Sequence, residues 1–84
     1  MNEISWTLRA AKQLRKLDRP QQSIIRDAVS VLAAMPSCTN VKRLSHHEYS
    51  YRLRVGNYRV MFNWHETIHV VYIEEVKKRD ERTY

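Results

Sequence analysis

The chain has 84 residues, 43% of them hydrophobic, and 15 Lys and Arg against nine Asp and Glu give it a net charge of +6 and a pI near 9.8. This length predicts one domain over residues 1–84, which buries only about 60–65% of its unfolded surface. The apolar runs are too short for a membrane protein, and the N-terminus lacks the features of a signal peptide. The single cysteine, Cys38, excludes an internal disulfide and fits a reducing cytoplasm. The high pI is typical of polyanion binders, although composition alone allows an ordinary basic surface equally well.

The N-terminal half predicts a short strand followed by a helical hairpin. Residues 2–6 alternate weakly, with Ile4 and Trp6 on one side. Thr7 is the predicted N-cap of a first helix, and Pro20 suits the first turn of a second helix that stops at Met35-Pro36. The predicted apolar stripes are Leu8, Ala11, Leu14 and Leu17 on the first helix, and Ile24, Ile25, Ala28, Val29, Leu32 and Met35 on the second. Because Asp18-Arg19 is a short connection, the two helices should be antiparallel.

The remainder predicts strands over residues 41–44, 49–55, 58–64 and 68–76. The last strand has apolar residues on both faces, which indicates a central, doubly covered position. A charged tail over residues 77–84 follows it. The predicted fold is α+β with the order β-α-α-β-β-β, an antiparallel sheet carrying the helix pair on one face and arginines on the other.

The segment from Tyr49 to Phe62 predicts a hairpin with a functional face. With Gly56-Asn57 as a two-residue loop, Val55 faces Tyr58, Arg54 faces Arg59 and Leu53 faces Val60. Tyr49, Tyr51, Leu53 and Val55 then share one face with Tyr58, Val60 and Phe62, and Arg52, Arg54 and Arg59 share the other. Like charges directly opposite each other destabilise a sheet, so the arrangement favours a phosphate-binding site over a solvated surface.

The chain resembles the RelE/ParE superfamily of bacterial type II toxins, and its RelE-like members most closely. The resemblance covers nearly the whole chain and rests on the paired helices and on three segments, which are Lys42-Arg43-Leu44, Tyr51 to Val60, and the ending Val76 to Tyr84. It implies a microbial-ribonuclease-like fold. It also implies metal-independent cleavage of translated mRNA in the ribosomal A site, with no cofactor.

The resemblance implies the roles of individual residues. Arg59 and Arg52 would bind the phosphate, Lys78 or its neighbour Arg79 would be the basic tail position, and Tyr84 would be the tail tyrosine. Ser50 stands where the best-known members have a lysine, and Arg54 on the same face could partly substitute for it. Further RNA contacts are expected from Arg54, Ser50, Lys77 and Arg43.

Cleavage of RNA by its own 2′-hydroxyl requires a base, charge stabilisation on the phosphorane and an acid for the leaving 5′-oxygen. The arginines can stabilise the charge, because guanidinium groups are permanently charged and offer paired donors. Tyr84 is the candidate base, provided that neighbouring cations lower its pKa, or else it stacks on a nucleobase. Lys78 or Arg79 is the candidate acid. The histidine pair His46-His47 lacks further ligands at metal-binding spacing, and Cys38 lies in no nucleophile motif.

The expected partners are a neutralising antitoxin, the ribosome with its mRNA, and operator DNA only as a toxin–antitoxin complex. No membrane partner is expected. Two alternatives remain open at this stage. One is a ParE-like inhibitor of DNA gyrase with the same fold, and the other is a nucleic-acid-binding module without catalysis, which would bind in a strongly salt-dependent manner.

Overall fold

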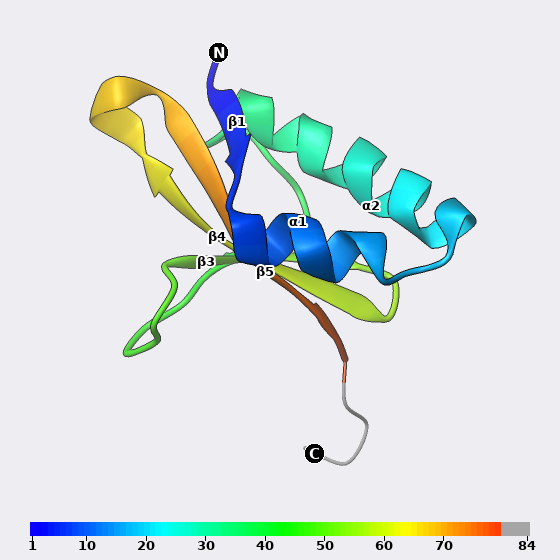
Figure 1. Cartoon of the computed structure of the whole chain (residues 1–84). Helices are drawn as coiled ribbons and strands as arrows, with labels where there is room; N and C mark the ends of the chain where they lie inside the picture. Colours follow the sequence, from blue (N-terminus) through cyan, green and yellow to red (C-terminus); the bar gives the residue numbers. More distant parts are fainter. Residues whose placement is uncertain (80–84) are drawn as a thin grey trace.

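The computed structural model describes residues 1–79, which form a layer of helices against one sheet (Figure 1). The elements, in chain order, are β1 (Glu3–Trp6), α1 (Leu8–Arg15), α2 (Arg19–Ser30), a 3₁₀ turn η1 (Val31–Ala34), β2 (Val41–Arg43), β3 (Tyr51–Val55), β4 (Tyr58–His65), a second 3₁₀ turn η2 (Glu66–Ile68) and β5 (Val70–Lys78). The predicted α+β class is confirmed. The order is β-α-α-β-β-β-β, which has one strand more than the predicted β-α-α-β-β-β, because each of the four segments predicted over residues 41–76 forms a strand of its own.

The strands of the described region form one sheet in the order β1-β5-β4-β3-β2. Neighbours pair antiparallel except β1, which runs parallel to β5 with Ile4 opposite Val71 and Trp6 opposite Ile73. The sheet is therefore mixed, and the prediction of a purely antiparallel sheet is wrong at this edge. The alternation of residues 2–6 decides which side chains face the core, but it does not decide which strand they join.

The helices differ from the predicted apolar stripes. Thr7 caps α1 as predicted, with its hydroxyl accepting from the Ala10 N–H at 3.2 Å. The buried residues of α1 are Ala10 and Leu14, whereas Leu8 is 67% exposed. In the second helix Ile25 and Val29 are buried as predicted, but Ile24 is 54% exposed. Apolar spacing gives the period of a helix, whereas the direction from which the sheet approaches decides which stripe is covered.

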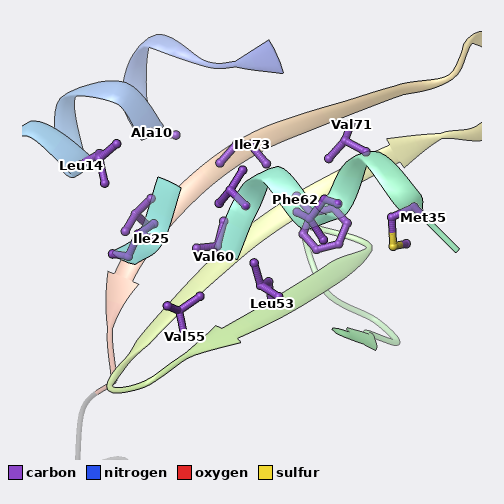
Figure 2. Close-up of a cluster of buried hydrophobic side chains, with 13 residues drawn as sticks. Ala10, Leu14, Ile25, Met35, Leu53, Val55, Val60, Phe62, Val71 and Ile73 are labelled. Atoms are coloured by element: carbon purple, nitrogen blue, oxygen red, sulfur yellow. The ribbon is translucent and has the colours of Figure 1, made fainter. Parts of the chain in front are cut away.

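The core lies between the helices and the sheet. Figure 2 shows Leu53, Val55, Val60 and Phe62 of the hairpin strands in one cluster with Ile25 of α2 and with Val71 and Ile73 of β5. Phe62 is fully buried, and its ring stacks on Tyr51 with centroids 5.4 Å apart. Burial of these apolar side chains fixes one face of the β3–β4 hairpin against the helices. The opposite face of the hairpin therefore points away from the helices.

A β-bulge in β5 changes which side chains share a face. Met61 of β4 pairs with Glu75, but the next residue, Phe62, pairs with Ile73, so Glu74 has no direct partner across the ladder. The bulge allows both Ile73 and Val76 to face the core. The strand lies inside the sheet between β1 and β4, but the predicted cover on both faces is only partial, since Val70 and Tyr72 are half-buried. It starts at Val70, because Ile68 belongs to η2 and is 58% exposed.

Beyond the end of β1, the start of α1 supplies hydrogen bonds to the edge of β5. The Thr7 N–H donates to the Ile73 carbonyl at 3.0 Å, and the Thr7 hydroxyl donates to the Glu74 carbonyl at 3.3 Å. Further along, the Gln13 side-chain oxygen accepts from the Val76 N–H at 2.6 Å. Backbone groups of β5 that do not pair with β1 thereby find hydrogen-bond partners in Thr7 and α1. Within residues 1–79, neither helix has the length and apolar content needed to cross a membrane.

Candidate functional site

The arginine face is built by the β3–β4 hairpin. The register is the predicted one, with Val55 opposite Tyr58, Arg54 opposite Arg59 and Leu53 opposite Val60. Gly56 occupies the first loop position with φ of +56°, which is the glycine position of a type II′ turn. Because Leu53, Val55 and Val60 are buried in the core, strand alternation turns Arg52, Arg54 and Arg59 to the opposite face.

These arginines line an open pocket beside the hairpin loop. Its lining residues are Arg52, Arg54, Gly56, Tyr58, Arg59 and Arg79. Arg79 follows the last residue of β5, and its backbone N–H donates to the Asn57 carbonyl at 2.6 Å. This bond ties the end of β5 to the hairpin loop, which brings a fourth guanidinium from a distant part of the sequence to the same pocket.

One of the lining residues, Arg52, carries an unsatisfied donor. The Nε atom of Arg52 is buried and has no hydrogen-bond partner among residues 1–79. Leaving such a donor unpaired costs about 1–3 kcal/mol, and the facing Arg54 and Arg59 add like-charge repulsion. A bound anion would relieve the repulsion between the arginines, because a phosphate offers negative charge and acceptor oxygens together. The arrangement is therefore chemically suited to a phosphate group.

Lys77 lies beside the pocket arginines. It pairs with Arg59 across β4 and β5, and its ammonium contacts a carboxylate oxygen of Glu75 at 3.6 Å. The lysine side chain is 55% exposed, so this ion pair contributes little to stability. A row of cations, Arg54, Arg59 and Lys77, thus crosses the three strands β3, β4 and β5 on one face.

Other residues expected at the site lie elsewhere. Lys78 pairs with Tyr58 and follows Lys77, so alternation directs it to the core side of the sheet, away from Arg59. Arg43 pairs with Tyr51, whose ring stacks on the core residue Phe62. Arg43 therefore also lies on the core side of the sheet, at its β2 edge.

Ser50 is exposed ahead of β3, where its N–H donates to the Asn63 side-chain oxygen at 2.9 Å. Tyr84 lies outside the described residues.

The sequence reasoning missed Lys42. It pairs directly with Arg52 across β2 and β3, and therefore shares the arginine face. The sequence shows Lys42 and Arg43 side by side, and only the strand register tells which of them faces the pocket. A shift of one residue would exchange them.

A second polar cluster lies around Tyr49, a buried residue that precedes β3. Its hydroxyl oxygen accepts from a guanidinium N–H of Arg9 in α1 at 3.4 Å. Burial raises the pKa of Tyr49, with Glu75 and then Glu48 adding to the effect and Arg9 opposing it. Tyr49 is therefore neutral at physiological pH and serves to hold the loop before β3 against α1.

The other reactive side chains considered from the sequence show no catalytic or metal-binding arrangement within residues 1–79. Cys38 is half-buried, and burial raises the pKa of its thiol, which disfavours the nucleophilic thiolate. His47 uses its Nδ1 atom to accept the Tyr49 N–H at 3.1 Å. In residues 1–79, no three His, Cys, Asp or Glu side chains are grouped as metal ligands.

Comparison with known proteins identifies the family. Residues 4–82 match the family model described as the ParE toxin of the type II toxin–antitoxin system parDE. The chain belongs to the RelE/ParE superfamily of type II toxins. No match was found among curated proteins.

Solved structures share the fold of this toxin. A chain of the archaeal RelE–RelB complex from Pyrococcus horikoshii is 21% identical and superposes with a TM-score of 0.81, covering 95% of the toxin and 97% of that chain. The isolated E. coli RelE toxin is 18% identical, with a TM-score of 0.80 and coverage of 96% and 87%. A chain of the intact E. coli RelBE complex is 21% identical, with a TM-score of 0.76 and coverage of 96% and 100%. The predicted superfamily and fold are confirmed.

Proposed function

We propose that the toxin is a ribosome-dependent endoribonuclease that cuts translated mRNA without a metal ion. The observation that carries the proposal is the pocket lined by Arg52, Arg54, Arg59 and Arg79, together with the buried Nε–H of Arg52, which has no partner within residues 1–79. In this proposal the scissile phosphate occupies the pocket. The 2′-hydroxyl attacks phosphorus, the bond to the 5′-oxygen breaks, and the products are a 2′,3′-cyclic phosphate and a free 5′-hydroxyl.

The arginines would stabilise the charge on the phosphorane, which is usually the largest catalytic contribution. Arg79 is preferred over Lys78 as the tail acid, because Arg79 lines the pocket and Lys78 pairs with Tyr58 on the core side. Tyr84 is retained as the proposed base. Neither an arginine nor a tyrosine has an unperturbed pKa near neutrality, so the reaction would depend on the ribosome to orient the substrate.

Mapping mRNA 5′ ends after brief induction tests the proposal. The wild type should produce cuts inside translated codons, and Arg59→Ala should reduce them by about 10²-fold or more, the usual cost of losing one oxyanion donor. Arg26→Ala, which removes an exposed charge from α2, is the matched control and should cut like the wild type. Tyr84→Phe should keep RNA binding and lose cleavage. Intact mRNA with the wild-type toxin would contradict the proposal.

Gyrase inhibition is the second candidate, and the family model that matches the chain favours it, because that model describes the ParE toxin. A supercoiling assay with purified gyrase separates the two. Inhibition of supercoiling together with uncut mRNA would assign the toxin to this second function. Cleavage with unaffected supercoiling would exclude it.

The proposed neutralising partner is an antitoxin that covers the arginine pocket with carboxylates and lays an apolar segment on the helices. The net charge of +6 favours an acidic partner, and Leu8, Ile24 and Val31 expose apolar surface on the helical layer. Operator DNA would be bound only by the toxin–antitoxin complex. Native co-purification with the co-expressed antitoxin tests the contact, and Arg54→Glu should weaken it.

A further inference from the structure

The strand register extends the cationic face beyond the pocket. One row across the sheet consists of Lys42, Arg52, Met61 and Glu75, and the next consists of Arg54, Arg59 and Lys77. Adjacent strands lie about 5 Å apart, so Lys42 on the edge strand β2 is the immediate neighbour of Arg52 on the same face.

Lys42 and Lys77 lie at opposite ends of this cationic face and differ in whether they have a counter-ion. Lys77 has Glu75 as a counter-ion at 3.6 Å, whereas Lys42 forms no ion pair within residues 1–79. Its neighbour across the ladder is Arg52, another cation. Like charges placed directly opposite destabilise a sheet. Exposed Arg43 also places a charge on this edge strand, so protection of the edge does not rest on Lys42 alone.

We propose that Lys42 binds a second phosphate, adjacent to the phosphate in the arginine pocket, and so positions a single-stranded RNA across β2 and β3. Lys42 lies outside the pocket lining, so it acts as a positioning residue and takes no part in the chemistry. The proposal rests on the proposed RNA cleavage. It also assigns to Lys42 the contact that the sequence assigned to Arg43, because Arg43 lies on the other face of β2.

Binding of non-cleavable 2′-O-methyl oligonucleotides by fluorescence anisotropy tests this site. A dinucleotide has one internucleotide phosphate and can fill the pocket only, whereas a pentanucleotide can also reach Lys42. With the pentanucleotide, Lys42→Ala should lower the salt slope by about 0.7 and weaken binding about fivefold at ~0.1 M salt, because one counterion release is lost. Dinucleotide binding should stay unchanged.

Arg43→Ala is the decisive comparison, because it removes the same charge from the neighbouring residue on the opposite face. It should affect pentanucleotide binding less than Lys42→Ala does. An equal or larger effect of Arg43→Ala, or an equal loss for both oligonucleotides in Lys42→Ala, would overturn the assignment of Lys42. Failure of the wild type to bind either oligonucleotide would instead count against the proposed RNA function itself.

Discussion

Replacing Arg52 with methionine should make the toxin more stable and inactive. Arg52 is half-buried, and its buried Nε has no partner within residues 1–79. Methionine keeps most of the apolar stem and removes both the unpaired donor and the charge beside Lys42 and Arg54. An unsatisfied buried donor costs about 1–3 kcal/mol, so allowing for some lost packing we expect a gain of about 1–2 kcal/mol.

The gain is large enough to measure in a domain of 84 residues. Each 1 kcal/mol shifts the melting temperature of such a domain by about 4–8 °C, so Arg52→Met should melt at least about 4 °C above the wild type in phosphate-free buffer. Millimolar phosphate should raise the melting temperature of the wild type more than that of the variant, because only the wild type retains the full site. Cleavage should fall by about 10²-fold.

The control is Arg26→Met, which removes an exposed arginine from α2 and should change stability by no more than about 0.5 kcal/mol. A melting temperature of Arg52→Met below that of the wild type in phosphate-free buffer would contradict a net cost of the unpaired Arg52 donor. Equal stabilisation of the wild type and the variant by phosphate would also contradict the prediction, because Arg52 would then take no part in anion binding.

The other predictions concern the fold around the site. Gly56→Ala should destabilise the protein by about 1 kcal/mol, because alanine is strained at a φ of +56°, and urea unfolding measures this loss. Asn2→Ala should cost about 2–3 kcal/mol, because the Asn2 side chain donates to the Met35 carbonyl at 3.0 Å and accepts from the Trp64 indole at 3.0 Å. Indole fluorescence should report that unfolding, and a change below about 0.5 kcal/mol would contradict it. The pKa of Tyr49 is higher in the folded protein than in the unfolded chain, so the neutral phenol favours folding. This contribution to the free energy of unfolding is present below about pH 10 and is lost at higher pH. Tyr49→Phe should therefore flatten the alkaline loss of stability, and an unchanged alkaline limb of the pH–stability curve would argue against this contribution.

The sequence by itself determined the hairpin and its arginine face. Glycine at residue 56 and strict alternation on both sides of it specify one loop and one register, and a slip by one residue would bury Arg52 and Arg54. The position of the first helix and its N-cap Thr7 were likewise local properties, since side-chain caps and apolar spacing act within a few residues.

Only the tertiary structure decided which distant residues join that face. The bond from Arg79 to Asn57 brings the end of β5 to the hairpin loop, and the pairing of β2 with β3 selects Lys42 over Arg43. The helices show the same limit, because Leu8 and Ile24 belong to the predicted apolar stripes and are nevertheless exposed. Local sequence fixes the period of each element, but long-range packing and ladder pairing fix how the elements are turned toward one another.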